Sequence, residues 1–234
     1  MNTSSNVWLV IPTYNERSNL EALVRRITTA GSWNILIVDD ASPDGTGALA
    51  DDLSQRWPQL AVLHRPKKEG LGPAYRHGLR EALDRGAELV IQSDADLSHP
   101  PELIPTMIER LQTTDLVIAS RYVAGGRMNI GWQRRWISLI GNVYIRFMLG
   151  WSVRDWSTGF KGWQAGMLDQ VLKAPLRTSG YACLMEMTWW ARKFGGRVAE
   201  VPLDFVDRTA GDSKFSIRII LEDIKMAWEL RWRR

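Results

Sequence analysis

Cysteine and histidine are scarce in this sequence, with one and three residues among 234. The single cysteine, Cys183, excludes an intrachain disulfide and a zinc site built from cysteines. It lies in an apolar helical pattern, and the motif GxSxG is absent, so no nucleophilic triad is indicated. His64, His77 and His99 are not spaced like metal ligands. The sequence therefore gives no support to thiol, serine or histidine-zinc chemistry.

Long apolar runs are also missing. A helix that crosses a bilayer needs about 20 mostly apolar residues. The best candidate, 136–151, is interrupted by Asn142 and Arg146. The first apolar run, 7–11, is too short for a secretory signal, and no basic residue precedes it. We therefore expect a cytoplasmic chain without a membrane-spanning helix.

The apolar residues that are present follow a pattern typical of an α/β protein. They make up 45% of the chain, enough for the core of one large domain. Short β-rich runs alternate with helical spacing, which predicts a largely parallel sheet. We expect strands at 7–11, 35–38, 61–64, 89–92, 116–120 and 198–202. We expect helices at 15–30, 46–57, 73–85, 101–111, 137–149, 183–194 and from 216. Asn15 or Ser18 is the expected cap of the first helix. We expect a mobile lid at 122–131.

Polar clusters follow three of the predicted strands, at 12–16, 39–45 and 93–99. In open α/β sheets, ligands bind outside the carboxyl ends of the strands. We therefore expect the three clusters to meet in one crevice. Each cluster alone is equally well explained as an ordinary loop, and it is their coincidence that favours a site.

The motif DADLSHP at 94–100 is the strongest local signal. Mg²⁺ and Mn²⁺ prefer oxygen ligands, commonly one or two carboxylates together with substrate phosphates. Asp96 is the primary candidate ligand, Ser98 can add a hydroxyl, and Asp94 can face the same cation or a nucleotide and its sugar. The alternative is a solvated turn that caps the helix beginning at Pro101.

The other two clusters offer groups for a nucleoside. Asp40 can accept hydrogen bonds from a base edge or a ribose, whereas Asp39 is better explained as structural. Tyr14 offers an aromatic face, and Glu16 offers an acceptor. The loop at 67–72 contains two lysines and two glycines and leads into the helix predicted from Pro73. A helix N-terminus beside a lysine can attract a phosphate, but an ordinary loop is the favoured interpretation.

Cations distributed along the second half could clamp a phosphate if they converge. The candidates are Arg121, Arg134, Arg208, Ser213 and Lys214. Each arginine taken alone is better explained as a surface residue. Glu186 lies within an apolar run, where a buried carboxylate needs a partner, and we expect it to pair with an arginine of this clamp.

The C-terminal segment, 216–234, predicts an amphipathic helix with a basic and aromatic end. Such an end suits the headgroup region of an anionic membrane. Its members are Trp228, Arg231, Trp232, Arg233 and Arg234. The alternative is a core-packing helix whose basic end is frayed.

The order of these motifs resembles that of the polyprenyl-phosphate mannosyltransferases, of which dolichol-phosphate mannose synthase is an example. The motifs are PTYNE at 12–16, VDDASPDGT at 38–46, EGLGPA at 69–74, DADLSHPPE at 94–102, SRY at 120–122 and DRTAGDSK at 207–214. The resemblance covers nearly the whole chain. It implies a GT-A fold, with a Rossmann-like, mostly parallel sheet flanked by helices, as a single catalytic domain over 1–215.

The resemblance also implies the substrates and the residues that contact them. GDP-mannose is the implied donor, a polyprenyl or dolichyl phosphate the acceptor, Mg²⁺ or Mn²⁺ the cofactor, and inversion at the anomeric carbon the outcome. The nucleotide-sugar contacts fall on Pro12, Tyr14, Glu16, Val38, Asp40, Asp94, Ala95, Asp96 and Arg121. The metal position falls on Asp96 and on Ser98, where some relatives have glutamine. The phosphate-binding positions fall on Arg121, Arg134 and Arg208, with Ser213 and Lys214 in the last motif.

Many relatives carry C-terminal membrane helices that this chain lacks. It resembles the short forms, which lie on the cytosolic face of a membrane or use an anchoring subunit. Two alternatives stay open: a glucosyltransferase that uses UDP-glucose, and a non-catalytic protein that binds an anionic ligand. The net charge of +4 is compatible with nucleic acid, but no recognition-helix or RNP pattern is present, so we expect no nucleic-acid partner.

Overall fold

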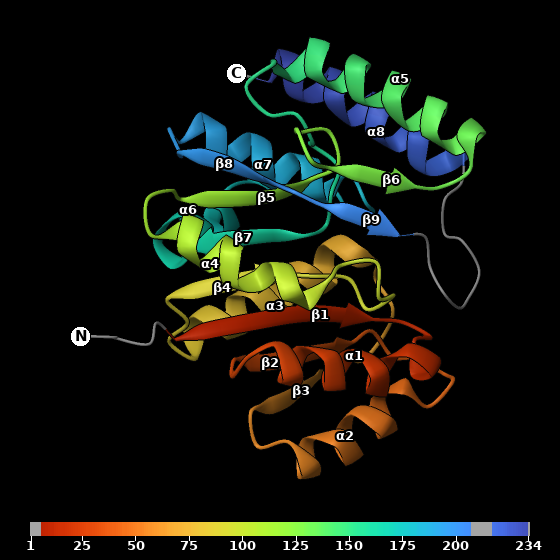
Figure 1. Ribbon diagram of the computed structural model, residues 1–234, viewed down its shortest axis with the longest axis vertical. Coiled ribbons are helices and arrows are strands. Elements are labelled where there is room, and N and C mark those ends of the chain that lie inside the picture. Colours follow the sequence, from red (N-terminus) through yellow and green to blue (C-terminus); the bar gives the residue numbers. More distant parts are fainter. Residues whose placement is uncertain (1–5, 207–216, 234) are drawn as a thin grey trace.

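The computed structural model describes residues 6–206 and 217–233, and its centre is a seven-stranded sheet (Figure 1). The strand order is β3-β2-β1-β4-β7-β5-β8. The strands are β1 (Val7–Thr13), β2 (Asn34–Asp39), β3 (Leu60–His64), β4 (Leu89–Gln92), β5 (Leu116–Ser120), β7 (Lys161–Gln164) and β8 (Val198–Pro202). All of them are parallel except β7, which is antiparallel to both of its neighbours. A separate parallel pair joins β6 (Arg127–Asn129) to β9 (Asp204–Val206).

Helices cover both faces of the sheet. The helices are α1 (Arg17–Ala30), α2 (Thr46–Arg56), α3 (Leu71–Asp84), α4 (Ile104–Leu111), α5 (Trp132–Leu149), α6 (Ala165–Lys173), α7 (Cys183–Lys193) and α8 (Ile217–Trp232), and a 3₁₀ turn (Pro101–Leu103) precedes α4. One apolar cluster joins one sheet face to α1, α2 and α4, and the other joins the opposite face to α3 and to α5–α8. Within β1, Leu9 faces the first cluster and Val10 the second, so both faces of this strand are buried, as in other parallel sheets.

The predicted strands and most predicted helices are confirmed to within a few residues, and the mostly parallel α/β sheet is as expected. Some boundaries and caps were wrong. Helix α1 begins after Glu16, and neither Asn15 nor Ser18 is its cap; Asn15 has a left-handed φ of 58°. Helix α5 begins at Trp132 rather than at 137, and part of the expected lid at 122–131 is strand β6.

The C-terminal helix α8 packs against α5 and α7 (Figure 1). Met226, Ala227 and Leu230 are its buried residues, whereas Leu221 and Trp228 on the predicted apolar face are more than half exposed. None of the helices within the described ranges is long and apolar enough to span a bilayer.

The end of α8 is held by a buried ion pair. Glu186 of α7 is fully buried and accepts hydrogen bonds from the backbone of Arg177 and from the backbone and hydroxyl of Thr178. Its ion-pair partner is Arg233, with Nη1 at 2.8 Å from Oε1. The expected pairing of Glu186 with a clamp arginine is therefore wrong, and Arg233 is not a frayed end, because its side chain is only 14% exposed.

We predict that Glu186→Ala lowers the free energy of unfolding by about 3–5 kcal/mol, since Arg233 and several backbone donors lose a buried partner. Arg233→Met should also lower it by about 3–5 kcal/mol, because the fully buried carboxylate of Glu186 loses its counter-ion. Urea unfolding measures both. As a control, Lys225→Met breaks an exposed pair with Glu229 and should change stability by less than about 1 kcal/mol. Equal losses for Glu186→Ala and Lys225→Met would contradict the assignment.

Candidate functional site

The loops that follow the parallel strands lie along one edge of the sheet. The register pairs Thr13 at the end of β1 with Asp39 at the end of β2, and β4 and β5 run in the same direction. The backbone N–H of Asp40 donates to the carbonyl of Thr13 at 3.0 Å, so the first two polar loops touch. The three predicted clusters therefore lie along one edge, but only residues of the third cluster line the cavity described next.

A cavity of about 220 Å³ lies beside this edge, under α5 and α8. Its polar wall comes from the loop after β4, from the residue after β5, from the segment before β7 and from the two helices. These residues are Asp94, Asp96, Ser98, His99, Arg121, Arg134, Ser138, Asn142, Ser157, Thr158 and Asp223. Its other wall is mainly apolar, with Ile137, Ile145, Leu184, Phe205, Ile220 and Ile224. Asp94, Asp96, Arg121 and Arg134 of the predicted groups therefore line one cavity that also has an apolar side.

The acidic end of the cavity is held in place by short hydrogen bonds. The hydroxyl of Tyr75, on α3, donates to Oδ1 of Asp94 at 2.7 Å. Burial, together with the nearby Asp94 carboxylate, raises the pKa of Tyr75 well above its ordinary value, so the phenol stays a donor. The ring nitrogen Nδ1 of His99 accepts the backbone N–H of Asp94 at 3.0 Å. Asp96 is buried, and its Oδ1 accepts both the N–H and the hydroxyl of Ser98.

These residues fit a hard divalent cation only in part. Among the side chains that the structure describes, no three histidine, cysteine, aspartate or glutamate residues gather as a metal site. Asp94 and Asp96 supply two carboxylates in one cavity, which is the number that Mg²⁺ and Mn²⁺ commonly take from protein when a substrate supplies further oxygens. The hydroxyl proton of Ser98 already goes to Asp96, so Ser98 can offer a cation only its oxygen lone pairs.

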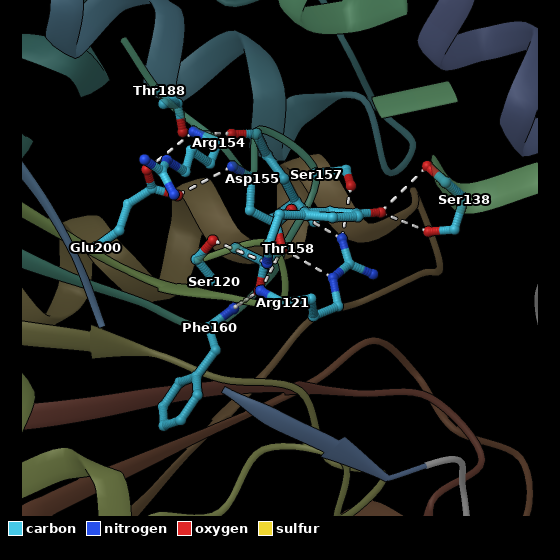
Figure 2. Close-up of polar contacts among 12 residues, drawn as sticks. Ser120, Arg121, Ser138, Arg154, Asp155, Ser157, Thr158, Phe160, Thr188 and Glu200 are labelled. Carbon is cyan, nitrogen blue, oxygen red and sulfur yellow. Dashed lines mark hydrogen bonds and ion pairs between the residues drawn. The ribbon is translucent and has the colours of Figure 1, made fainter. Parts of the chain in front are cut away.

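Arg121 is fixed by a carboxylate that sequence reasoning missed. Nε and Nη2 of Arg121 donate to the two oxygens of Asp155, each at 2.8 Å, and Nη2 also donates to the hydroxyl of Ser157 (Figure 2). Burial alone would raise the pKa of Asp155, but the adjoining guanidinium holds it below its ordinary value. Burial alone would also lower the pKa of Arg121, and Asp155 more than reverses this. Both groups are therefore charged at neutral pH.

The expected nucleoside-binding groups lie outside the cavity, and several already have protein partners. Asp40 forms a buried ion pair with Arg65, and its Oδ2 accepts the N–H groups of Glu69 and Gly70. The ammonium of Lys68 lies 3.5 Å from the centre of the Tyr14 ring. The sequence predicted neither Arg65 as the partner of Asp40 nor Lys68 as the partner of Tyr14.

The remaining predicted contacts differ in how far they can reach a ligand. Glu16 is buried and accepts from the side chain of Asn19 at 2.9 Å, whereas Pro12 is half-buried. Val38 and Ala95 are buried in the apolar core, so only their backbone can reach a nucleotide. Arg134 reaches the cavity from the first turn of α5. Arg208, Ser213 and Lys214 lie outside the described residues.

A second unpredicted carboxylate, Asp223 of α8, lines the cavity. Burial and the neighbouring Glu222 raise its pKa to about 7, and Arg121 opposes this only in part. A negative charge at this place is therefore disfavoured below neutral pH.

The comparisons with known proteins agree with this geometry. Residues 8–172 match the family described as Glycosyl transferase family 2. The chain belongs to this family. This glycosyltransferase is 41% identical over 221 residues to undecaprenyl-phosphate mannosyltransferase of Micrococcus luteus, covering 93% of this chain and 90% of that one. It is 41% identical over 231 residues to polyprenol monophosphomannose synthase of Mycolicibacterium smegmatis, covering 96% and 87%. It is 37% identical over 232 residues to dolichol-phosphate mannosyltransferase of Pyrococcus furiosus, covering 97% and 64%.

Solved structures share the fold of this glycosyltransferase. Mannosyl-3-phosphoglycerate synthase from Rubrobacter xylanophilus has a TM-score of 0.65 at 19% identity, covering 98% of this chain and 74% of that one. Mannosyltransferase PcManGT from Pyrobaculum calidifontis, solved in complex with GDP-Man and Mn²⁺, has a TM-score of 0.58 at 15% identity, with coverages of 98% and 74%. The predicted GT-A-like fold is confirmed.

We predict that the ionisation of Asp223 makes the free energy of unfolding of this glycosyltransferase vary with pH. Because the folded pKa of about 7 lies above that of an unfolded aspartate, stability falls as pH rises from about 4 to about 7. Asp223→Asn should therefore be more stable than the wild type at pH 8, by about 1–3 kcal/mol, and should differ little at pH 4. Urea unfolding at the two pH values measures this. The exposed control Asp52→Asn should show no such difference, and a pH-independent effect of Asp223→Asn would contradict the prediction.

Proposed function

We propose that this glycosyltransferase transfers mannose from GDP-mannose to a polyprenyl phosphate, with inversion at the anomeric carbon and with Mg²⁺ or Mn²⁺ as cofactor. One observation carries the proposal: a single cavity joins the two carboxylates of the loop after β4, two arginines and an apolar wall. A nucleotide diphosphate with a cation fits the acidic end, a phosphate fits the arginines, and an isoprenoid chain fits the apolar wall. The names of the three relatives agree on mannose and on a lipid phosphate.

The acceptor needs no general base from the protein. A phosphate monoester has its second pKa near 6, so it is largely ionised at neutral pH and can act as the nucleophile itself. One of its oxygens attacks C1 of the mannose, and the bond from C1 to the diphosphate breaks. A single displacement of this kind forms no covalent enzyme intermediate and inverts the configuration.

The protein has to bring together two anions that repel one another. Arg121 and Arg134 both line the cavity, and charge-assisted hydrogen bonds from guanidinium groups can orient a phosphate. Asp96 would hold the cation, with Asp94 beside it, and Ser98 orients Asp96 through its hydroxyl. A bound divalent cation would neutralise the charge that builds on the departing diphosphate. The PcManGT complex, with GDP-Man and Mn²⁺, supports this pairing of donor and cation.

We further propose that α5 and α8 place the cavity at a membrane surface. Apolar side chains project from α5 and from the turn directly after it at intervals of three or four residues, and their exposed fractions range from 52% to 72%. They are Trp132, Trp136, Ile140, Val143, Phe147 and Trp151. We call these residues, together with Leu221 and Trp228 of α8, the apolar face. Exposed apolar areas of this extent commonly mark protein or membrane contacts, and tryptophan suits the membrane interface.

Two residues that line the cavity are also exposed on the helices that carry the apolar face. Ile137 of α5 and Ile224 of α8 both line the cavity, and they are also 44% and 38% exposed. The backbone carbonyl of Ile224 lies 3.5 Å from the hydroxyl of Tyr144, which links the two helices there. A lipid phosphate could therefore place its headgroup at Arg121 while its chain stays in the bilayer. The cytosolic side and an anchoring subunit stay predictions from the sequence.

The donor and the metal role are tested together by transfer assays. The purified protein with Mg²⁺ or Mn²⁺ and a short polyprenyl phosphate should form a labelled lipid from radiolabelled GDP-mannose and not from UDP-glucose. Asp96→Asn should reduce transfer by about 100-fold or more, because charge stabilisation at the leaving group is lost. The exposed control Asp52→Asn should leave transfer unchanged. Turnover by Asp96→Asn close to that of the wild type would refute the metal role.

Membrane binding is tested separately by co-sedimentation with vesicles of phosphatidylcholine, with and without phosphatidylglycerol. Trp132→Ser combined with Phe147→Ser should weaken partitioning by about tenfold or more, since each large apolar side chain contributes about 1.5–3 kcal/mol when buried. Trp57→Gln provides the control, because α2, which Trp57 follows, lies at the opposite end of the molecule (Figure 1). Equal partitioning of the double variant and the wild type would refute the membrane-facing role.

A further inference from the structure

The six residues 155–160, with the sequence DWSTGF, cross between the two ends of the cavity. They lead directly into β7, which is inserted between β4 and β5. The carbonyl of Phe160 accepts the backbone N–H of Ala119 on β5 at 3.0 Å. The segment therefore passes beside both the loop that carries Asp94 and the residue that carries the cavity's guanidinium, Arg121.

At its first end, the segment fixes the direction of Arg121. Asp155 engages the Nε and Nη2 side of the guanidinium, and Ser157 accepts a further hydrogen bond from Nη2 (Figure 2). Within the described residues, no hydrogen-bond acceptor is found for Nη1. A guanidinium is planar, so fixing one edge also fixes the direction of the remaining donors. Asp155 and Ser157 thereby determine which donors Arg121 presents to a phosphate.

Asp155 is itself held rigidly. Its side chain is fully buried, and its carboxylate also accepts the backbone N–H of Arg121 at 3.1 Å. Glu200 of β8 accepts the backbone N–H groups of Arg154 and Asp155 at 2.9 and 3.0 Å. The carboxylate of Asp155 is therefore bound to the backbone that follows β5, and the backbone of Asp155 is bound to β8.

At its other end, the segment contacts Asp94. A Cβ atom placed on Gly159 would lie 3.0 and 3.1 Å from the two carboxylate oxygens of Asp94, so a side chain there would displace the carboxylate. The ring of Phe160 stacks on that of His99, with centroids 4.8 Å apart and planes at 9°. His99 in turn accepts the N–H of Asp94. The absence of a side chain at Gly159 and the stacking of Phe160 both set the position of Asp94.

We propose that residues 155–160 form one positioning element that sets the separation between the acceptor phosphate at Arg121 and the donor at Asp94. This inference rests on the proposed function, since it assigns those two substrates to those two residues. None of the six residues needs to touch the reacting atoms. The two ends act on different substrates, so substitutions at the two ends should have separable effects.

The separation is tested by binding and kinetics with each substrate varied alone. Asp155→Asn should raise the KM and the Kd of a short polyprenyl phosphate by about tenfold, with the values for GDP-mannose within about twofold of the wild type. Gly159→Ala should weaken the binding of GDP and GDP-mannose and leave the values for the polyprenyl phosphate within about twofold of the wild type. Ser152→Ala, at an exposed position just before the segment, is the control and should change neither. The proposal is overturned if each variant weakens the binding of both substrates equally, or if neither variant weakens the binding of either substrate.

A second experiment guards against simple misfolding of Asp155→Asn. Arg121→Gly removes the side chain, and low concentrations of guanidinium ion should partly restore acceptor binding and transfer by occupying its place beside Asp155. The double variant Arg121→Gly with Asp155→Asn should not be restored, because the carboxylate that orients the ion is gone. Equal rescue of both variants would refute the positioning role.

The binding measurements allow this inference to be tested separately from the proposed function. Calorimetric titration with GDP, and with polyprenyl phosphate, needs no turnover. A wild-type protein that binds both ligands but transfers no mannose would refute the proposed function, while the opposite effects of Asp155→Asn and Gly159→Ala on binding could still be observed. Normal transfer with no such opposition would refute the positioning element alone.

Discussion

The ion pair between Asp155 and Arg121 is the interaction on which the arrangement of the site depends. A fully buried carboxylate is tolerated only if a cation and hydrogen-bond donors compensate its charge. Arg121 follows β5, and Asp155 belongs to the loop that precedes β7, so the pair requires this loop to lie over the carboxyl end of β5. Glu200 extends the constraint to β8 through two backbone N–H groups. One buried charge therefore fixes three neighbouring segments.

A second constraint comes from the balance of charges inside the cavity. Its described lining contains the carboxylates of Asp94, Asp96 and Asp223 together with the guanidinium groups of Arg121 and Arg134. The charge of Arg121 is already balanced by Asp155, which lies outside the lining. Two anionic substrates would add to this negative charge. A divalent cation, and protonation of Asp223 near neutral pH, both reduce it. The negative charge of the lining and of the substrates is therefore the electrostatic reason why a cation is expected.

Parallel strands and the polar loops at their ends could be predicted from sequence because each strand is a continuous apolar run between turn residues. Strand β7 could not, because it has only four residues and its ends are Lys161 and Gln164. The partner of Asp40, Arg65, is 25 residues away, and no spacing rule links them. Glu186 was expected to need an arginine, but which arginine depends on how α8 packs on α7. The apolar face of α5 was missed because this run was considered as a bilayer-crossing segment and as a helix of the fold, but not as a helix with an exposed apolar side.

The proposed entry of the lipid acceptor beside Ile137 and Ile224 has a consequence for selectivity. A closed pocket contacts its ligand along the whole length, whereas an open pocket contacts only the portion of the ligand that enters it. With one side of the entrance facing hydrocarbon, the enzyme would read the headgroup and the first isoprene units of its acceptor and remain indifferent to everything beyond them. Tolerance for lipids of different lengths would then follow from the shape of the entrance, with no dedicated recognition residue.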